Sequence, residues 1–464
     1  MRFAALSALC CSVLLCNAQP AGFEDEVIKH HAALVRLDTT NPPGNETRAV
    51  EYLKKILDAQ GIPAVVVGAQ PARMNLIARI KGNGSKKPIL LMGHTDTVGI
   101  DPKKWVKHGP FSADREDGFI YGRGTNDDKD SVAAYLTLIL TLKRQNVPLD
   151  RDVIFLAEAA EEAGAGTYGV KWVLDNHRKE IEAEFSLAEG GGGRREKGKL
   201  LFTQVGTAEK IPRGATLVAR GPAGHGSRPT PNNAVVALAQ AVAAAAAWMP
   251  PMKLNDTTRA YFERLAAISP PEVAERYNNL LRTDKGAAVQ AWFKANDPGH
   301  YSTVTTSVTP TMIKAGYQFN VIPSEAEAML DIRMLPDEDM DKFFEGLRKA
   351  INNPAVEVVP RTGALRPKTA PSSLESEMFK AIETANKKVF PGIRVIPTMG
   401  TGATDSAYLR ELGVQAYGVG PAIDAEDTGL GYGAHSDQER ISEQALRDFS
   451  RFAWTIVQEI AATR

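Results

Sequence analysis

The chain has 464 residues, more than one hydrophobic core usually serves, so we expect two domains or one domain with a large insertion. Hydrophobic residues make up 43% and charged residues 24%, a balance typical of a globular enzyme rather than of a disordered or membrane-spanning chain. Lys plus Arg and Asp plus Glu both number 55, so the formal net charge is zero and no nucleic-acid partner is expected.

The N-terminus carries a pattern typical of a secretory signal peptide. Arg2 precedes an apolar run at residues 3–16, and small residues follow at Ala18 and Ala21. The run is shorter than the roughly 20 apolar residues that a membrane-spanning helix needs, and no later segment approaches that length. We therefore expect residues 1–18 to be removed during export, with a periplasmic or secreted product that does not insert into a membrane.

All three cysteines, Cys10, Cys11 and Cys16, lie in that segment. The mature chain would then contain none, which excludes thiolate metal ligands and cysteine nucleophiles. Any metal ion must therefore be held by histidine and carboxylate side chains.

Residues 22–207 alternate short apolar runs with helical periodicity, which predicts an α/β domain with a mainly parallel sheet. Residues 89–92, 153–157 and 185–187 are expected to be buried strands, and residues 131–145 an amphipathic helix. The polar residues described below follow these strands. An open α/β sheet places its functional site at that edge.

The pattern changes between residues 208 and 365 to strand, helix, strand, strand, helix, strand, with a charged helical stretch at 257–296. From residue 366 to 464 the α/β rhythm returns. We therefore predict a larger α/β domain of residues 22–207 and 366–464, with a smaller α+β domain, residues 208–365, inserted into it.

A run of glycines at residues 190–193 is the one compositionally biased segment. A phosphate-binding loop would follow a strand and open a helix, and this run does not lead into a helical pattern. We interpret it as a flexible loop beside a strand end.

His94 is the first candidate metal ligand. It lies in the segment GHTDT directly after the predicted strand 89–92, and Asp96 stands two residues further on. A neutral imidazole can bind zinc while a neighbouring carboxylate accepts its other N–H. The pair alone would fit a structural hydrogen bond equally well.

Two acidic segments follow along the chain. Asp127 stands just ahead of the predicted helix, where a carboxylate suits the helix N-terminus and could also bridge two cations. Glu161 and Glu162 follow the strand 153–157, where adjacent carboxylates are usually solvated. Next to a metal site the two residues could have different roles, with Glu162 as metal ligand and Glu161 as general base.

Glu189 ends the apolar segment 185–188, and His435 lies near the C-terminus. Each alone would more often be an ordinary surface residue. Together with His94, Asp127 and Glu162 they form a set of nitrogen and oxygen ligands that suits zinc and tolerates manganese or cobalt.

In this order the segments resemble the co-catalytic di-zinc exopeptidase family, which includes aminoacylase, acetylornithine deacetylase, succinyl-diaminopimelate desuccinylase and carboxypeptidase S. The resemblance covers nearly the whole mature chain and implies helices on both faces of the sheet and an inserted lid domain. It implies two zinc ions, one held by His94, Asp127 and Glu189 and one by Asp127, Glu162 and His435. It also implies that Asp96 orients His94.

The lid segments are similar to the family's as well. His225, in the segment GPAGHGSRP, matches a lid histidine that reaches the active site of the partner subunit in a homodimer formed through the lid. Asn320 and Arg333 match lid residues that bind substrate, and an arginine suits a carboxylate because it can bind both oxygens. Thr401 and Gly402 resemble a substrate-side loop of the catalytic domain.

The activity implied by the resemblance is hydrolysis of an amide bond next to a free carboxylate, by a metal-activated water with Glu161 as general base. The long lid looks most like that of the carboxypeptidase S and N-acyl-amino-acid hydrolase branch. Small peptides and N-acyl amino acids both remain open as substrates. A dipeptidase is an alternative, although dipeptidases of the family often have Asp in place of Glu189, and a non-catalytic binding domain on the same fold is another.

Overall fold

The computed structural model describes residues 19–163, 166–363 and 365–463. The chain divides into two compact units. Of the described residues, the first unit contains those up to Thr207, Ser372–Thr398 and those from Thr404 onward, and the second contains those within Ala208–Pro371 and Met399–Ala403. The predicted signal segment, residues 1–18, lies outside the described residues.

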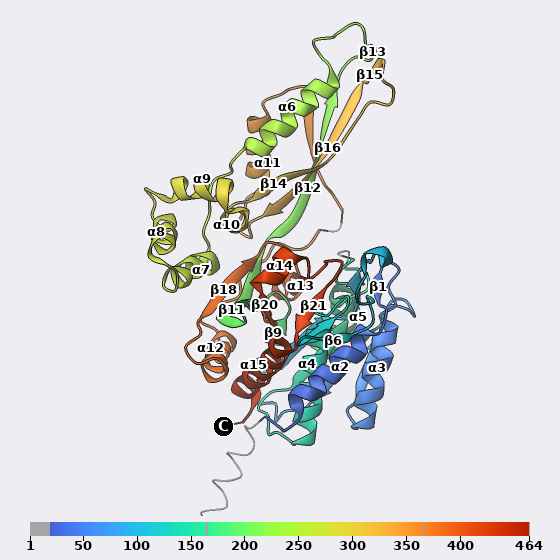
Figure 1. Ribbon diagram of the computed structural model, residues 1–464, viewed down its shortest axis with the longest axis vertical. Helices are drawn as coiled ribbons and strands as arrows, with labels where there is room; N and C mark the ends of the chain where they lie inside the picture. Colours follow the sequence, from blue (N-terminus) through green and yellow to red (C-terminus); the bar gives the residue numbers. More distant parts are fainter. Residues whose placement is uncertain (1–18, 164–165, 364, 464) are drawn as a thin grey trace, which may run out of the picture. The chain divides into compact units, whose positions relative to one another are not determined.

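A mixed ten-stranded sheet forms the centre of the first unit (Figure 1). Its middle strands are parallel neighbours in the order β8 (Val153–Glu158), β4 (Ile89–His94), β9 (Phe185–Ala188) and β19 (Gln415–Gly418). Mostly antiparallel strands flank this centre: β3 (Asn75–Ile80) and β2 (Ala64–Val67) on one side, and β11 (Lys199–Glu209), β10 (Gly192–Glu196), β20 (Ala422–Asp424) and β18 (Val395–Gly400) on the other. The predicted α/β fold with a parallel sheet is confirmed.

Alternate side chains of the central strands are buried against helices on opposite faces of the sheet. Leu91 and Phe155 belong to one core, and Leu90 and Ile154 belong to another. Strands buried on both faces show continuous apolar runs, which explains their sequence pattern. The first core includes α2 (Phe23–Val35), α3 (Thr47–Ala59), α4 (Lys129–Arg144), α12 (Glu377–Val389) and α15 (Glu443–Ala461), and the second includes α5 (Val170–Ile181) and α13 (Ser406–Glu411).

Short strands bring distant segments of the first unit together. β21 (Arg440–Ser442), β7 (Phe119–Tyr121) and β6 (Asp114–Glu116) form a small antiparallel sheet in that order. The loop that begins after β7 and the loop that ends at β21 are therefore attached to neighbouring strands. Also in this unit are β1 (Thr40–Asn41), β5 (Thr97–Val98), the 3₁₀ turn η1 (Pro102–Lys104) and α14 (Ala425–Leu430).

The second unit is built on a four-stranded antiparallel sheet. Its order is β14 (Ser307–Ala315), β16 (Glu325–Met334), β12 (Ile211–Arg220) and β17 (Val356–Pro360). The helices α6 (Ala234–Ala247) and α11 (Met340–Ile351) share its hydrophobic core (Figure 1). A separate two-stranded ribbon pairs β13 (Gly224–His225) with β15 (Val321–Ile322).

Four further helices of the second unit occupy the charged stretch and the residues just after it: α7 (Asp256–Ala266), α8 (Pro271–Leu280), α9 (Gly286–Asn296) and α10 (Pro298–Val304). They surround an aromatic cluster in which Phe262 and Phe293 are fully buried. The His300 ring lies against both, with centroid distances of 5.4 and 5.3 Å. This helical insertion therefore has a small core of its own.

The glycine run at 190–193 differs from the prediction of a flexible loop. Strand β10 begins at Gly192 and pairs with both β11 and β20. A Cβ atom at Gly191 would lie 2.1 Å from the backbone oxygen of Gly418, so the chains approach too closely for a side chain. The sequence alone did not distinguish close strand approach from flexibility, because both favour glycine.

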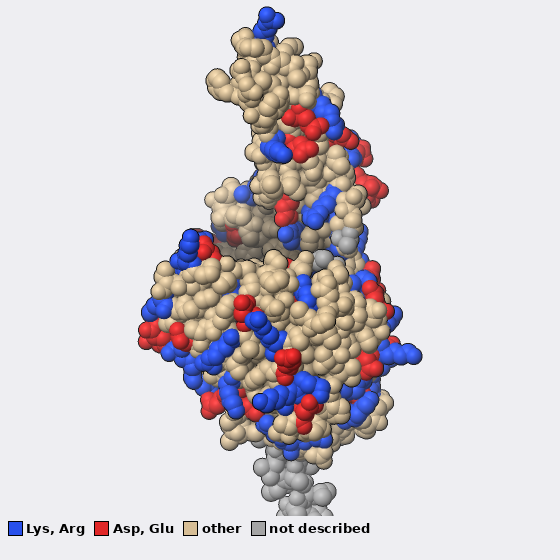
Figure 2. All heavy atoms as spheres, turned by 90° about the vertical axis from the view of Figure 1, so that its right-hand side faces the viewer, with Lys and Arg blue, Asp and Glu red and all other residues tan. Residues whose placement is uncertain are grey.

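The surface carries charges of both signs. Figure 2 shows Lys and Arg interspersed with Asp and Glu over the face on view, without an extended area of one sign. Among the described helices, none combines the length and the apolar character that crossing a bilayer requires.

Candidate metal centre

The five predicted metal ligands come from strand ends and adjoining loops of the first unit. His94 is the last residue of β4, Glu162 follows β8 and Glu189 directly follows β9. Asp127 precedes α4, and His435 lies in the loop that leads to β21. Parallel strands place their carboxyl ends at one edge of the sheet, which is why residues so far apart in sequence can meet there.

Asp127 lies between the two histidines. Its Oδ1 is 2.9 Å from His94 Nε2, and its Oδ2 is 3.0 Å from His435 Nε2. His94 Nε2 also lies 3.8 Å from Glu189 Oε2, and His435 Nε2 lies 2.9 Å from Glu162 Oε1. The side chains thus fall into two groups that share Asp127, and these are the groups to which the family resemblance assigned one zinc ion each.

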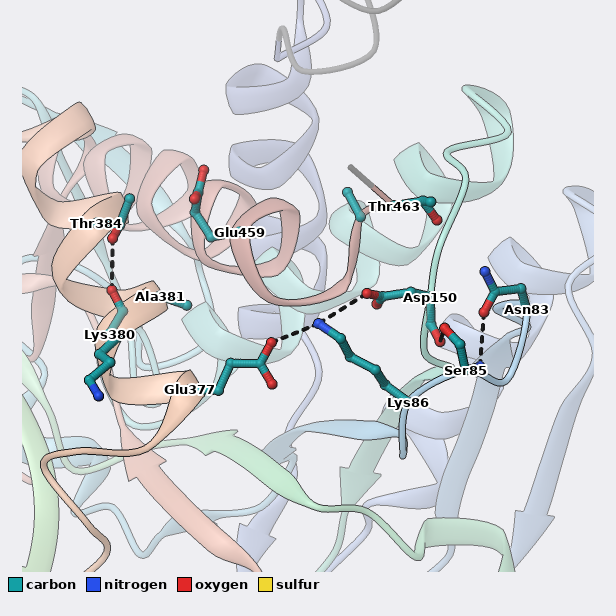
Figure 3. A pocket seen from close by; sticks show the side chains of 11 residues that line it. Asn83, Ser85, Lys86, Asp150, Glu377, Lys380, Ala381, Thr384, Glu459 and Thr463 are labelled. Atoms are coloured by element: carbon teal, nitrogen blue, oxygen red, sulfur yellow. Dashed lines mark hydrogen bonds and ion pairs between the residues drawn. The ribbon is translucent and has the colours of Figure 1, made fainter.

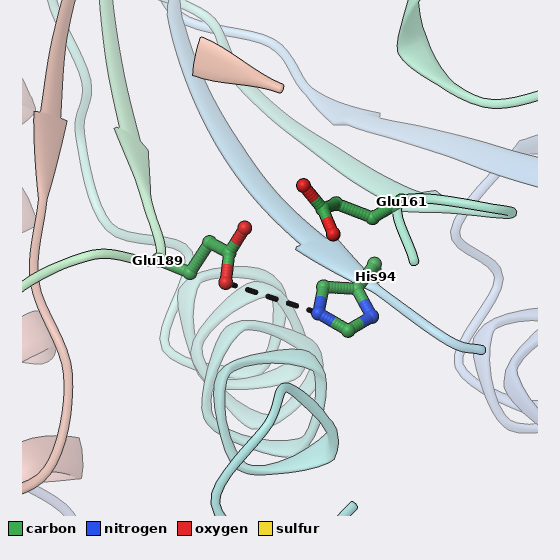
Figure 4. A group of neighbouring side chains, drawn as sticks. All are labelled: His94, Glu161 and Glu189. Atoms are coloured by element: carbon green, nitrogen blue, oxygen red, sulfur yellow. Dashed lines mark ion pairs between the residues drawn. The ribbon is translucent and has the colours of Figure 1, made fainter. Parts of the chain in front are cut away.

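Glu161 also lies beside His94. One potential ligand atom from each of His94, Glu161 and Glu189 lies within 4.8 Å of the others, and the same holds for His94, Asp127 and Glu162. Figure 4 shows the carboxylates of Glu161 and Glu189 near the His94 ring, with the ion pair to Glu189 drawn as a dashed line. Glu161 is therefore near enough to act on a water molecule at the cluster or to bind a cation itself.

Asp96 holds the turn that carries the two glutamates. Its Oδ1 accepts the N–H of Glu161 at 3.1 Å, and its Oδ2 accepts the N–H of Glu162 at 3.2 Å and an amide hydrogen of Asn41 at 2.9 Å. Burial raises the pKa of Asp96, but hydrogen bonds from His94, Asn41 and Glu161 outweigh burial and keep this pKa below its usual value. Asp96 therefore stays ionised and positions the Glu161–Glu162 turn, a role that the sequence did not reveal.

The His94 ring is held by its other nitrogen. Nδ1 lies 3.0 Å from the backbone oxygen of Asp96 and 3.5 Å from its carboxylate. Both neighbours are acceptors, so they favour the ring form with hydrogen on Nδ1. That form leaves the lone pair of Nε2 directed toward Asp127 and Glu189, where a cation could bind.

The electrostatics of the cluster fit divalent cations. Burial and the negative charge of Glu161 raise the pKa of Glu189 well above its usual value. Hydrogen bonds to Asp127 and Glu162 raise the pKa of His435 to about 10. Without ions, protons must offset part of the buried negative charge, and a divalent cation can replace them. The nitrogen and oxygen donors suit zinc, with cobalt and manganese also compatible.

The predicted lid residues His225 and Asn320 belong to the second unit. His225 ends β13 and is exposed, and its Nδ1 accepts the N–H of Ser227 at 3.1 Å. Asn320 immediately precedes β15, and its backbone oxygen accepts the N–H of Gly226 at 2.7 Å. The two residues therefore lie on neighbouring segments of one ribbon, and their action on substrate stays a prediction.

The other predicted substrate-binding residues are also in the second unit. Arg333 lies in β16 and forms an ion pair with Asp331 of the same strand, with Nε 2.8 Å from Oδ1. Thr401 and Gly402 are exposed in the segment Met399–Ala403. Their contact with substrate stays a prediction as well.

A cavity of about 590 Å³ lies away from the cluster (Figure 3). Lys86 crosses part of it and pairs with Asp150 at 3.1 Å and with Glu377 at 2.7 Å. Lys86 precedes β4 and Asp150 precedes β8, so the cavity lies at the amino ends of strands whose carboxyl ends carry the cluster. The charged side chains that line it already have ion-pair partners, inside or outside the cavity, and nothing in these described residues indicates catalysis.

Three residues beside the cluster were missed by sequence reasoning: the half-buried Asn41 and the buried Arg123 and Glu439. Arg123 and Glu439 carry opposite charges and stand four residues from a proposed ligand, Asp127 and His435 respectively. That spacing was a usable signal, because a buried ligand often has a charged neighbour that orients it.

Residues 90–459 match the sequence profile of Peptidase family M20/M25/M40. The chain belongs to this family. It is 27% identical over 401 residues to the probable carboxypeptidase S-like 2 of Dictyostelium discoideum, covering 83% of this chain and 74% of the relative. It is 27% identical over 381 residues to the N-fatty-acyl-amino acid synthase/hydrolase PM20D1 of Homo sapiens, covering 81% and 74%.

Among solved structures, the fold is similar to that of the M20 family metallo-carboxypeptidase Sso-CP2 from Sulfolobus solfataricus. The TM-score is 0.69 at 22% sequence identity, and the match covers 94% of this chain and 99% of that one. The predicted family is confirmed. The chain is accordingly a metallohydrolase of the M20 family, with a candidate ligand cluster at the expected edge of its sheet.

Substitution of His435 tests the ligand cluster. We expect the chelator-stripped protein to take up two equivalents of zinc, and His435→Ala to take up one fewer, because only Asp127 and Glu162 would remain for the second ion. Metal analysis after gel filtration measures the uptake. His177→Ala, which alters a histidine of α5 away from the cluster, is the matched control and should retain both equivalents. Full uptake by His435→Ala would contradict the assignment.

Proposed function

We propose that the chain is a di-zinc hydrolase that cleaves an amide bond adjacent to a free carboxylate, as a carboxypeptidase or an N-acyl-amino-acid amidohydrolase. The proposal rests on one observation: Asp127 and four other ligand-type side chains form one cluster, and Glu161 stands beside it. The names of two relatives, a carboxypeptidase S-like protein and an N-fatty-acyl-amino acid synthase/hydrolase, support the two substrate classes.

The zinc ions, when bound, would lower the pKa of a water molecule and polarise the amide carbonyl. Glu161 would take the proton of that water, because it lies by His94 and neither proposed ligand group needs it. It would then give the proton to the leaving amine. Asp96 keeps Glu161 within reach by accepting its backbone N–H at 3.1 Å.

His225 is suited to donate a hydrogen bond to the carbonyl oxygen. Since the N–H of Ser227 donates to Nδ1 at 3.1 Å, the neutral ring must carry its hydrogen on Nε2. A donor of this kind, aimed at an oxygen that becomes negative during the reaction, commonly lowers the barrier by roughly 3 kcal/mol. We propose that Arg333 binds the substrate carboxylate, with Asn320, Thr401 and Gly402 contacting the rest of the substrate.

We also propose that the protein is exported to the periplasm or the medium. Residues 1–18 have the signal-peptide pattern, and no cysteine occurs after Cys16. The mature chain would have no thiol that an oxidising compartment could oxidise.

A homodimer through the second unit completes the proposal. In the described sheet, β14 is an edge strand with β16 as its neighbour, and its Met312 and Ile313 are each 64% exposed. Helix α6, which packs on the same sheet, has no charged residue, yet Val235 and Val236 are 38% and 52% exposed. An exposed edge strand and an uncharged apolar helix favour pairing with a second copy. In a symmetric dimer, β14 and α6 of both copies would then be covered.

Replacing Glu161 separates metal binding from turnover. We expect Glu161→Gln to keep both zinc equivalents and to lose about 10²- to 10⁴-fold in kcat, since an amide cannot accept the proton. Glu162→Gln is the matched control and should lose one equivalent of zinc. If Glu161→Gln loses zinc while Glu162→Gln keeps both ions, the roles of the two glutamates are reversed.

The substrate carboxylate provides a test of the reaction class. We expect amidation of the C-terminus of a peptide or N-acyl amino acid to raise the barrier by several kcal/mol, because Arg333 would lose a charged partner. The ratio of kcat/KM values for zinc-loaded protein on free and amidated substrates measures this. Arg333→Lys should reduce the ratio, whereas Arg220→Lys, at an exposed site on the neighbouring strand β12, should not. Equal kcat/KM for both substrates would refute the proposed function.

Mixing two inactive variants tests whether His225 acts in the partner subunit. His225→Ala and Glu161→Gln should each be nearly inactive alone. After subunit exchange in mild denaturant, the heterodimer should regain part of the activity, because one of its sites carries both substitutions and the other carries neither. Turnover and native mass spectrometry are measured on the same sample. Heterodimers without any recovered activity would show that His225 does not act across the interface.

A further inference from the structure

Asp127 and His435 lie on loops rather than on strands. Asp127 belongs to the loop of residues 122–128, between β7 and α4, and His435 to the loop of residues 431–439, between α14 and β21. His435 has a φ of 64°, which is uncommon for a residue other than glycine. Such a conformation persists only where the surroundings hold it. Some contact between the two loops must therefore fix the 3.0 Å separation of Asp127 Oδ2 and His435 Nε2.

The side chain of Glu439 joins the two loops. It is fully buried, and its Oε1 accepts the N–H of Asn126, the residue before Asp127, at 3.0 Å. The backbone oxygen of Glu439 accepts the N–H of Gly122 at 2.9 Å, and the Asn126 side chain donates to the backbone oxygen of Arg440 at 3.0 Å. The first loop is thus hydrogen-bonded to the end of the second at several points.

Arg123 provides the opposite charge. Its guanidinium is 2% exposed, and Nη1 donates to Glu439 Oε2 at 2.6 Å. Nη2 lies 3.5 Å from the backbone oxygen of His435, so the same guanidinium reaches both the carboxylate and the proposed ligand. Two charges buried together and hydrogen-bonded in this way hold their geometry closely.

The base of the second loop is anchored by Arg440. Its guanidinium pairs with Asp427 at 2.5 and 3.1 Å and lies over the rings of Phe119 and Tyr432, at 3.7 and 4.0 Å from their centroids. The N–H of Arg440 donates to the backbone oxygen of Tyr432 at 3.0 Å. The loop is therefore closed at its base by Arg440, while Glu439 connects that base to the Asp127 loop.

We infer that Glu439 and Arg123 are positioning residues for the zinc ion proposed at Asp127, Glu162 and His435. The inference rests on the proposed di-zinc site. The two loops carry two of the three ligands of that ion, whereas His94 and Glu189 of the other ion stand at the ends of β4 and β9. Loss of the ion pair should therefore weaken this zinc position much more than the other, which shares only Asp127 with the two loops. A pair that served stability alone would not discriminate between them.

The test uses Glu439→Gln in two backgrounds. Glu189→Gln leaves the Asp127, Glu162 and His435 position complete, and Glu162→Gln leaves the His94, Asp127 and Glu189 position complete. Competition with a chelator gives the zinc Kd of each metal-free protein. We expect Glu439→Gln to raise Kd about 10- to 100-fold in the first background and less than about threefold in the second.

Arg123→Lys should repeat this selectivity, and it replaces Glu439→Gln if that variant does not fold by circular dichroism. Arg151→Lys is the matched control: Arg151 is also fully buried and pairs with Glu184 and Glu377, at 3.0 and 2.9 Å, at the amino ends of the strands. It should lower the thermal stability without changing either Kd.

Equal changes of Kd in the two backgrounds, or no change in either, would overturn the inference while wild-type uptake of two zinc equivalents leaves the proposed function intact. A wild-type chain that binds no zinc would overturn both.

Discussion

Mutual repulsion among buried carboxylates at the carboxyl ends of β4, β8 and β9 is the constraint on which the site depends. Glu161 and Glu189 approach the same imidazole, and burial together with the charge of Glu161 raises the pKa of Glu189. A cluster of carboxylates this close together is unfavourable unless cations or protons offset its negative charge. Cation binding would therefore contribute to the stability of the folded chain as well as to its chemistry, because the unfolded chain does not gather these groups.

The ligands reach the cluster by two structural routes. His94 and Glu189 are placed by parallel strands whose positions are set by a core on both faces of the sheet. Asp127, Glu162 and His435 lie on loops, which need support from further side chains. Asp96 gives that support to the Glu161–Glu162 turn, and Glu439 gives it to the other two loops. The loop-borne ligands thus depend on residues that contribute no ligand atom themselves.

The sequence predicted the strands and the proposed ligands better than the contacts behind them. β4 and β8 were predictable because strands buried on both faces show continuous apolar runs, and the residues that follow them point to chemistry. Glu439 and Asn41 were not, because a single carboxylate or amide carries no local pattern, and its role depends on a partner that is distant along the chain. The run at Gly191 was misinterpreted for a similar reason, since the backbone of Gly418 that excludes a side chain there lies more than 200 residues away.

The two units differ in how firmly they hold their functional groups, and this difference fits the proposed division of labour. The first unit buries part of its cluster: His94 and Asp96 are almost completely buried and Glu161 is 8% exposed, whereas the His435 side chain is 52% exposed. Buried groups held by several hydrogen bonds suit metal ions and proton transfer, which tolerate little displacement. In the second unit His225 is exposed, and its ring is oriented by local contacts with the backbone N–H and the hydroxyl of Ser227. In its proposed role, His225 meets a carbonyl oxygen in another subunit, so its ring has to remain accessible. The ring can therefore be oriented only by residues next to it in its own segment.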